Sequence, residues 1–326
     1  MRPKVLVTRK IFDESLAMVA KHCDVESNQR DIPFTPKQLF QKLQGKAGVI
    51  CLLTDSISDE VLAKHPQLKI VSNVAVGYNN IDVKAATRRR VMVTNTPGVL
   101  DDTTADFTWC LILATARGLI GADRTFRSGK WKGWGVMQFL GRDVHHKTLG
   151  ICGLGRIGKG VARRARGFDM RVLYTDVQRV PEALERELGV TFVDKKTLLQ
   201  ESDIVTLHVP LFAETTHYIG APELRFMKKT AILINASRGP VVDEKALVKA
   251  LKGGWIAGAG LDVYEKEPTP APGLTRLPNT VLAPHVASAS IETRRKMSDM
   301  AAANCVAGLT GQRPPNLVNP EVLAQR

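Results

Sequence analysis

The sequence predicts an α/β protein with two doubly wound parallel sheets, and three observations predict this class. Short apolar segments of strand type alternate with helical patterns along almost the whole chain, which is typical of parallel sheets. The 326 residues suffice for two domains, and 44% hydrophobic with 24% charged residues are globular values. Pro97-Gly98 interrupts the pattern and marks a boundary between the two sheets.

The first hundred residues predict the smaller sheet. Thr35 followed by Pro36 indicates a helix start, because proline is favoured at the first helical position. No glycine-rich fingerprint occurs in this part, and we expect a flavodoxin-like domain. Its expected strands are 4–8, 48–53, 68–73 and 91–94, and its expected helices are 11–21, 36–44, 58–64 and 83–90.

The second sheet is expected between residues 147 and 284. Before it, the polar residues 101–104 precede a long apolar helix that we expect to run to 116–125. Residues from 287 onward are again helical and are expected to return to the first domain. The predicted domains are therefore 1–100 with 287–326, and 101–286, with hinges near 97–101 and 285–290 and a cleft between them. The expected strands of the second sheet lie near 149–152, 171–175, 203–208, 231–235, 256–261 and 280–283.

The most informative local pattern is a glycine-rich turn between a strand and a helix. Gly153 follows the strand 147–152, and a helix is expected at 156–168. In a dinucleotide-binding fingerprint, Gly153 makes the turn, Gly155 lets the backbone approach the pyrophosphate, and Gly158 lets helix and strand pack closely. The helix N-terminus supplies N–H groups and partial positive charge for phosphate. This context predicts a Rossmann-type domain that binds a dinucleotide.

Asp176, at the end of the next strand, predicts which dinucleotide is bound. A carboxylate there accepts hydrogen bonds from the adenosine ribose hydroxyls and repels a 2′-phosphate, which favours NAD(H). Arg179 is instead able to grip a 2′-phosphate, and the small Thr175 leaves room for one. NADP(H) therefore stays open as the second cofactor.

Three further segments follow strands of the second domain, at the edge where open α/β sheets bind their ligands. They are residues 234–240, 260–268 and 281–288, and they bring Arg238, Asp262, Glu267 and His285 to that edge. Reduction of an α-keto acid needs a cation for the carboxylate and a proton donor for the carbonyl oxygen. Arginine offers a planar fork to a carboxylate, and histidine donates a proton near neutral pH when a carboxylate favours its charged form. These residues predict a catalytic set of Arg238, Glu267 and His285.

Composition argues against other classes of function. The net charge of +14 is spread along the chain, no nucleic-acid-binding motif occurs, and a diffuse positive field also attracts small anionic substrates. No apolar run reaches the ~18–20 residues that span a bilayer, and Lys4 leads directly into a strand without a signal-peptide pattern. The five cysteines have neither disulfide nor metal-site spacing and are expected to be buried thiols. We expect a cytoplasmic protein without metal, membrane or nucleic-acid partners.

The three segments 234–240, 260–268 and 281–288 closely resemble those of the D-isomer-specific 2-hydroxyacid dehydrogenases. The resemblance covers essentially the whole chain. It implies that Arg238 binds the substrate carboxylate and polarises the carbonyl, that Glu267 assists His285, and that His285 is the acid/base. It also implies that the backbone N–H groups of Val76 and Gly77 meet the substrate carboxylate. The implied cofactor contacts share the glycine turn, the strand ends and the start of the long helix: Thr104, Gly153, Leu154, Gly155, Arg156, Ile157, Gly158, Asp176, Val209, Pro210, Ala236, Ser237, Arg238, Asp262 and His285.

Within that family the chain looks most like the glyoxylate/hydroxypyruvate reductases, through residues 74–82, 95–100 and 127–141. Tyr78 and Asn79 differ from many relatives, which leaves open a larger 2-keto acid such as 2-ketogluconate. Val76 stands where the similar phosphite dehydrogenases carry a lysine, which argues against phosphite oxidation. Corepressors that share the fold and bind NAD(H) are a further, less favoured alternative.

The apolar stretch that contains Trp131, Trp134, Met137 and Phe139 has two interpretations. These residues are either core, or an arm that packs across a two-fold dimer, as the resemblance implies. We expect a homodimer.

Overall fold

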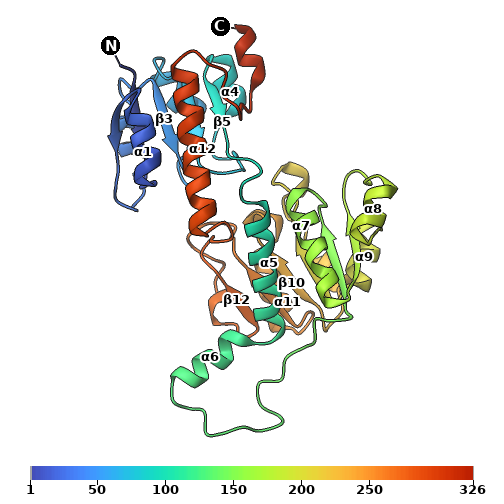
Figure 1. Ribbon diagram of the computed structural model, residues 1–326. Helices are drawn as coiled ribbons and strands as arrows, with labels where there is room; N and C mark the ends of the chain where they lie inside the picture. Colours follow the sequence, from blue (N-terminus) through green and yellow to red (C-terminus); the bar gives the residue numbers. More distant parts are fainter. Residues whose placement is uncertain (1, 326) are drawn as a thin grey trace. The chain divides into compact units, whose positions relative to one another are not determined.

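A computed structural model describes residues 2–325 of the chain (Figure 1). The chain forms two compact units, each built around one parallel sheet. Unit 1 comprises the residues up to Leu100 and those from Ala289 onward, and unit 2 is Asp101–Ser288. The predicted fold class is therefore confirmed.

Unit 1 contains a five-stranded sheet in the order β2-β1-β3-β4-β5, and all its neighbours pair in parallel. Strand β2 is not predicted by the sequence, because its residues Asp-Val-Glu-Ser lack a hydrophobic pattern and form a partly exposed edge strand. Edge strands bury little surface, so they carry a weak sequence signal. The strands are β1 (Lys4–Val7), β2 (Asp24–Ser27), β3 (Gly48–Cys51), β4 (Ile70–Asn73) and β5 (Met92–Thr94).

The helices of unit 1 cover both faces of this sheet. The predicted start at Thr35 is confirmed: its side chain accepts a hydrogen bond from the amide of Gln38 in a capping box, and Pro36 follows. One face carries α12, which packs against α1, β3 and β4 although it follows unit 2 in the sequence. The helices are α1 (Asp13–Ala20), α2 (Pro36–Lys42), α3 (Asp59–Lys64), α4 (Val83–Arg88) and α12 (Ile291–Leu309), followed by the 3₁₀ turn Pro320–Gln325.

Unit 2 contains a seven-stranded parallel sheet in the order β12-β11-β10-β9-β6-β7-β8. The chain moves outward from β6 to β8 and then returns to β9 on the other side of β6. Open α/β sheets bind their ligands at such a reversal, at the carboxyl ends of the strands. The short edge strand β8 escaped the sequence analysis as β2 did. The strands are β6 (Thr148–Cys152), β7 (Arg171–Thr175), β8 (Val190–Phe192), β9 (Ile204–Leu207), β10 (Ile232–Asn235), β11 (Gly258–Leu261) and β12 (Thr280–Leu282).

Helices sandwich the sheet of unit 2 and bury one apolar cluster on each face. On one face α5 (Asp101–Ala116) packs against α7 (Arg156–Ala165) and against β10 and β11 (Figure 1). The other face carries α9 (Lys195–Glu201), α10 (Ala221–Phe226) and α11 (Glu244–Lys252). In the sequence, α8 (Glu182–Leu188) connects β7 to β8. Short 3₁₀ turns are Arg166–Phe168, Ala213–Thr215, Gly239–Val241 and Leu274–Arg276.

The long helix expected to reach 116–125 is in fact two helices. The first, α5, begins at Asp101 itself and ends at Ala116, and α6 (Leu119–Arg127) starts after Gly118. Gly118 has a φ of +60°, a conformation that glycine adopts readily, and the two helices are bent by 67°. Within residues 2–325 no single helix is long and apolar enough to cross a membrane, although α5 and α6 taken together meet the length and composition for a bent span.

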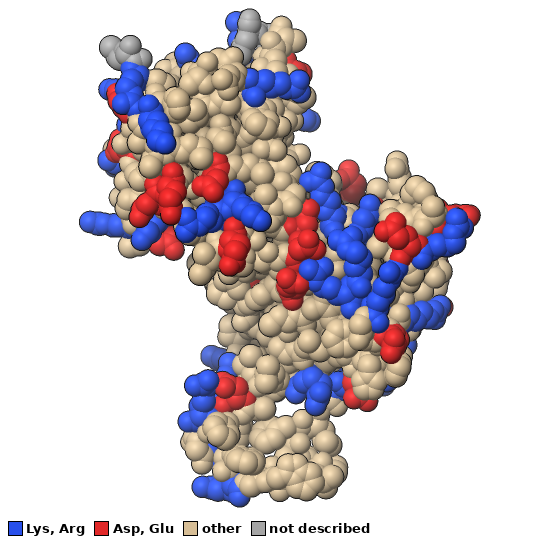
Figure 2. All heavy atoms as spheres, viewed as in Figure 1, with Lys and Arg blue, Asp and Glu red and all other residues tan. Residues whose placement is uncertain are grey.

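After α6, the chain up to Gly141 forms an apolar arm, and the interpretation of its side chains as core residues is wrong. Trp134 is 84% exposed and Met137 is 76% exposed. This part of unit 2 carries few charged side chains on the face shown in Figure 2. The expectation of five buried thiols also needs one correction, because Cys110 on α5 is exposed.

Candidate active site

The glycine turn after β6 has the shape that a dinucleotide requires. Gly153 has a φ of +92°, and a Cβ on Gly158 would lie only 2.2 Å from the Gly153 carbonyl oxygen. A Cβ on Gly155 would instead meet no protein atom within 4 Å, so the backbone of Gly155 faces open space. The three glycines thus divide their work between a turn, close packing and open access. This cradle fits a pyrophosphate bound at the start of α7.

The predicted cofactor residues around this turn lie at the carboxyl ends of β6 and β9. Leu154, Arg156 and Ile157 form the turn and the first residues of α7. Val209 and Pro210 follow β9, and the backbone just before them adjoins the turn, since a Cβ on Gly153 would lie 2.9 Å from the His208 carbonyl carbon. Thr104 lies buried in the first turns of α5.

Asp176 follows β7 directly and binds the glycine turn. Its Oδ2 accepts a hydrogen bond from the Leu154 amide at 2.7 Å, and its Oδ1 accepts one from the Val177 amide at 2.7 Å. The carboxylate is therefore fixed beside the turn. Each oxygen keeps a further lone pair for a ribose hydroxyl.

The strand ends of unit 2 carry the predicted catalytic residues. Because β10, β11 and β12 are parallel neighbours, their carboxyl ends lie at one edge of the sheet. Arg238 follows β10, Glu267 follows β11 and His285 follows β12. The structure thus brings all three to the same edge as the glycine turn.

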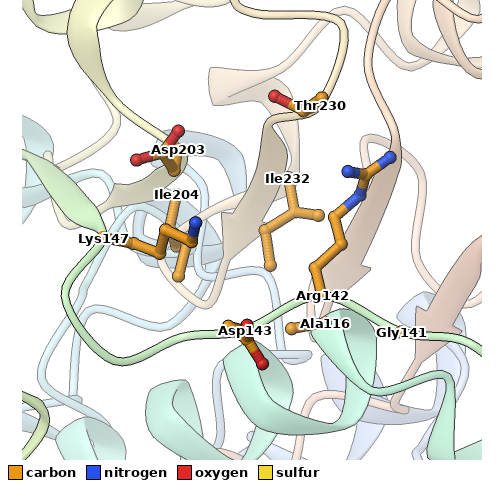
Figure 3. Close-up of a pocket in the computed structure, with 9 residues that line it drawn as sticks. All are labelled: Ala116, Gly141, Arg142, Asp143, Lys147, Asp203, Ile204, Thr230 and Ile232. Carbon is orange, nitrogen blue, oxygen red and sulfur yellow. The ribbon is translucent and has the colours of Figure 1, made fainter.

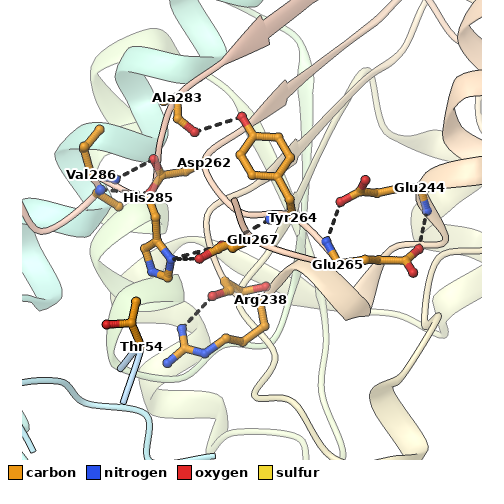
Figure 4. A network of polar contacts seen from close by, with 12 residues as sticks. Thr54, Arg238, Glu244, Asp262, Tyr264, Glu265, Glu267, Ala283, His285 and Val286 are labelled. Atoms are coloured by element: carbon orange, nitrogen blue, oxygen red, sulfur yellow. Dashed lines mark hydrogen bonds and ion pairs between the residues drawn. The ribbon is translucent and has the colours of Figure 1, made fainter. Parts of the chain in front are cut away.

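His285 and Glu267 form a hydrogen-bonded pair, shown in Figure 4. The His285 Nδ1 atom lies 2.9 Å from Glu267 Oε2 and 3.1 Å from Oε1. Burial by itself would raise the pKa of Glu267, but the hydrogen bond and the charge of His285 lower it below its ordinary value. Nε2 is the ring nitrogen that this pair does not use.

Arg238 is held by the turn after β10. The Asn235 side chain accepts from the Ser237 amide at 3.0 Å and donates to the Arg238 carbonyl at 2.9 Å. Arg238 Nη1 donates to the Ser237 carbonyl at 2.7 Å, and Ala236 is buried. Burial lowers the pKa of Arg238, and the neighbouring charge of Glu267 opposes that shift.

Asp262 is fully buried, and both its carboxylate oxygens bind backbone groups. Oδ1 accepts from the Val286 amide at 2.7 Å and Oδ2 from the Ala287 amide at 2.8 Å, while the Asp262 carbonyl accepts from the His285 amide at 2.8 Å. Burial raises the pKa of Asp262, although these amides and His285 act against it. Asp262 therefore positions His285, a role that the sequence did not suggest, and its cofactor contact stays a prediction.

Two positioning residues were missed because their contacts are tertiary and leave no local pattern. The Tyr264 amide donates to Glu267 Oε1 at 3.2 Å, and the Tyr264 hydroxyl donates to the Ala283 carbonyl at 2.9 Å. Tyr264 thereby links the segments of Glu267 and His285. Glu244, buried at the start of α11, accepts from the amides of Glu265 and Ala271, and its own amide donates to Glu265 Oε1 at 2.7 Å.

The two predicted substrate residues of unit 1, Val76 and Gly77, lie in the loop after β4. Asn95 donates to the Val76 carbonyl at 2.8 Å, and Asn73 donates to the Gly77 carbonyl at 2.9 Å. These bonds hold the loop through its carbonyl groups, and its amides are not used in them.

A cavity of about 290 Å³ lies elsewhere in unit 2, at the amino-terminal edge of the sheet (Figure 3). Its lining includes Lys147 just before β6, Asp203 just before β9 and Ile232 at the start of β10. This edge is opposite the one that carries the glycine turn and the His285–Glu267 pair. The cavity is therefore separate from the candidate active site.

Comparison with known proteins identifies the family. The family model of the D-isomer specific 2-hydroxyacid dehydrogenase, NAD binding domain, matches residues 109–287. The chain belongs to the D-isomer specific 2-hydroxyacid dehydrogenases. A glyoxylate reductase from Korarchaeum cryptofilum is 54% identical over 100% of this chain and 98% of its own length.

Solved structures agree with this family assignment. A protein from Thermus thermophilus has a TM-score of 0.90 and 41% identity, over 97% of this chain and 99% of its own. An NADPH-dependent glyoxylate/hydroxypyruvate reductase from Sinorhizobium meliloti, in complex with NADP and malonate, has a TM-score of 0.87 and 33% identity, over 99% of this chain and 98% of its own. This 2-hydroxyacid dehydrogenase is thus an oxidoreductase that uses a nicotinamide dinucleotide.

Proposed function

We propose that this dehydrogenase is a glyoxylate reductase that also reduces hydroxypyruvate, giving glycolate and D-glycerate. The observation that carries the proposal is the His285–Glu267 pair, which shares one sheet edge with Arg238 and the glycine turn. The relatives named glyoxylate reductase support the substrate class. The D configuration follows from the family assignment.

The proposed mechanism assigns one task to each side chain. The nicotinamide dinucleotide supplies a hydride when bound, and the residues of the glycine turn together with Asp176 hold it. Arg238 binds the substrate carboxylate and polarises the keto group, since a guanidinium matches a carboxylate with two parallel hydrogen bonds. His285 donates a proton from Nε2 to the keto oxygen, and the ionised Glu267 stabilises the charged imidazole through Nδ1.

The substrate carboxylate is further proposed to meet the amides of Val76 and Gly77, which gives unit 1 a substrate-binding role and unit 2 the cofactor-binding role. Small α-keto acids suit this scheme because their recognition needs only the carboxylate and the keto group. Reduction of a larger 2-keto acid such as 2-ketogluconate is less favoured, as the relatives are named for glyoxylate. A corepressor-like role is less favoured for the same reason.

NADH is the proposed preferred cofactor. Asp176 places a carboxylate at the ribose-binding strand end, where it repels a 2′-phosphate. Arg179, the residue able to bind that phosphate, is paired with Glu185. The Sinorhizobium meliloti enzyme, which has the same fold, was solved in complex with NADP. The preference between NAD and NADP therefore depends on the residues near the ribose 2′ position and not on the fold.

A homodimer that uses the apolar arm is also proposed. Exposed side chains such as Trp134, Met137 and Leu140 form a surface that a second copy of the chain would cover. Sedimentation analysis of the wild type and of a Trp134→Ser, Met137→Ser variant tests this, and a wild type that stays monomeric contradicts it. The cytoplasmic location stays a prediction from the sequence.

The function is tested by following NADH oxidation with glyoxylate, hydroxypyruvate and 2-ketogluconate, each repeated with NADPH. We expect the highest kcat/KM with glyoxylate or hydroxypyruvate and NADH, and D-glycerate as the product of hydroxypyruvate. A higher kcat/KM with 2-ketogluconate would replace the proposed substrate. L-glycerate on chiral analysis would contradict the family-based stereochemistry.

A further inference from the structure

The loop between β7 and α8 carries two residues with opposite preferences at the ribose 2′ position. Asp176 disfavours a 2′-phosphate, whereas an arginine at position 179 is chemically suited to bind one. The role assigned to Arg179 here rests on the proposed function only in that the site binds a nicotinamide dinucleotide.

Arg179 is held by a two-pronged ion pair with Glu185 on α8. Its Nε donates to Glu185 Oε1 at 2.9 Å, and its Nη2 donates to Glu185 Oε2 at 2.7 Å. The Glu185 side chain is only 9% exposed, so this is not an ordinary surface pair. The Nε–Nη2 edge of the guanidinium is thus taken by one carboxylate, whereas the Arg179 side chain as a whole is 55% exposed.

Tyr174 fixes Glu185 from the other side. Its buried hydroxyl donates to Glu185 Oε1 at 2.7 Å and accepts from the Val180 amide at 3.0 Å. Tyr174 belongs to β7 and Val180 follows Arg179 directly. The hydroxyl of Tyr174 therefore joins the end of β7 both to the loop and to α8. Arg179, Glu185 and Tyr174 are referred to below as the arginine lock.

Near neutral pH, the groups of the arginine lock are in the charge states that their hydrogen bonds need. Arg179, and then the Tyr174 hydroxyl, lower the pKa of Glu185 to about 2. Burial, and then the bond to Glu185, raise the pKa of Tyr174 to about 12. The carboxylate therefore stays ionised and the phenol stays protonated, which are the states that these hydrogen bonds need.

We propose that Glu185 is a specificity-determining residue that withholds Arg179 from the 2′-phosphate of NADP(H). To bind that phosphate through its Nε–Nη2 edge, Arg179 must leave Glu185, whose buried carboxylate would then keep only the bond from Tyr174. Losing the cationic partner of a buried charge is costly, and while the pair stays formed the charge of Glu185 offsets that of Arg179, so NADPH gains little from Arg179 in the wild type. Discrimination thus has two parts: Asp176 repels the 2′-phosphate, and Glu185 sequesters the cation that would attract it.

The test is Glu185→Gln, which removes the charge and keeps an oxygen that accepts from Tyr174. Equilibrium binding of NADPH and NADH is measured by fluorescence without any keto acid. We expect the Kd of NADPH to fall about tenfold, the range of one charge-assisted interaction gained, and the Kd of NADH to change less than about twofold.

Two controls separate this effect from a general disturbance. Glu187→Gln removes one negative charge at an exposed position of the same helix, α8, and should change neither Kd. Arg179→Ala in the Glu185→Gln background should abolish the gain for NADPH. A gain that survives Arg179→Ala, or an unchanged ratio of the two Kd values in Glu185→Gln, overturns the proposal.

Arg179→Ala alone keeps the proposal falsifiable if Glu185→Gln does not fold. If Glu185 withholds Arg179 from the phosphate, this variant should bind NADPH as the wild type does. Weaker NADPH binding by Arg179→Ala would show that Arg179 already contacts the phosphate and would overturn the proposal. Since no turnover is measured, a protein that binds NADH but does not reduce glyoxylate refutes the proposed function and leaves this inference intact.

Discussion

The backbone of His285 is held in an uncommon conformation. Its φ is +56°, a left-handed value that costs a non-glycine residue about 1–3 kcal/mol unless its surroundings impose it. Asp262 imposes it, because its carbonyl binds the His285 amide and its carboxylate binds the next two amides. This strained backbone directs the imidazole toward Glu267, which is consistent with a catalytic role.

His285→Ala should remove the proton donor while leaving the glycine turn and Asp176 unchanged. We expect kcat to fall by about 10²–10⁴, the usual contribution of general acid catalysis. Steady-state kinetics with glyoxylate measures the loss, and NADH fluorescence should give a Kd close to that of the wild type. Near-normal turnover across the pH range would remove His285 from the mechanism.

Glu267→Gln should lower kcat without abolishing activity. The glutamine carbonyl still accepts the hydrogen bond from His285 Nδ1, but no carboxylate charge stabilises the imidazolium. We expect kcat with glyoxylate to fall by about tenfold, the value of one charge-assisted hydrogen bond, and therefore less than in His285→Ala. Steady-state kinetics of the two variants side by side measures the difference. A kcat equal to that of the wild type would contradict a role for the Glu267 charge.

At the scale of elements, the turns after β10 and β11 interlock through Gly239. A Cβ on Gly239 would lie 1.8 Å from the Tyr264 carbonyl oxygen, closer than any side chain permits. Two hydrogen bonds between Glu244 and Glu265 also join the start of α11 to the segment after β11. The segment of Arg238 and the segment of Glu267 are therefore positioned by each other.

Gly239→Ala should consequently damage both stability and activity. Forcing the two turns apart should destabilise the protein by about 1–3 kcal/mol, as overpacking does, and lower kcat more than NADH affinity. Thermal unfolding and kinetics measure the two effects. Gly167→Ala is the matched control, because a Cβ there meets nothing within 4 Å. Equal behaviour of the two variants would show that the contact with Tyr264 does not matter.

The elements that the sequence predicted well have strong local signals. The glycine turn, the apolar central strands and the Thr35 cap all depend on neighbouring residues. The break at Gly118 was missed because the apolar pattern continues across it, and β2 and β8 because edge strands bury little. Tyr264, Glu244 and Glu185 act through partners distant in the sequence or on another element, so no local pattern marks them.

At the scale of the whole molecule, basic residues dominate but many are paired. Figure 2 shows Lys and Arg side chains gathered over α7, with acidic side chains beside them. Arg164 pairs with Asp102 at 3.2 Å and with Asp106 at 2.6 Å, which joins α7 to α5. Exposed pairs of this kind add little stability, so the pH dependence of folding depends more on buried groups.

His208, partly buried just after β9, is the group whose charge should govern stability in weak acid. Its Nε2 lies 3.0 Å from Thr206 Oγ1, and burial lowers its pKa from 6.5 to about 4. In this pH window the unfolded chain binds a proton that the folded protein does not. The contribution of His208 to the free energy of unfolding should therefore be fully present above pH 6.5. It should decrease as the pH falls toward 4, by at most about 1.4 kcal/mol per pH unit.

The measurement is denaturant unfolding at intervals between about pH 7.5 and 4.5, for the wild type and for His208→Gln. The glutamine keeps a polar group near Thr206 but cannot take up a proton, so the variant should lose much of the decline below pH 6.5. The paired carboxylates Glu185 and Glu267, whose pKa values are lowered, add their own loss only at lower pH, near and below the 4.5 of an ordinary glutamate. His145→Gln, at an exposed position, is the control and should follow the wild type. If His208→Gln keeps the full slope of the wild type, the His208 imidazole is not the group that makes folding sensitive to weak acid.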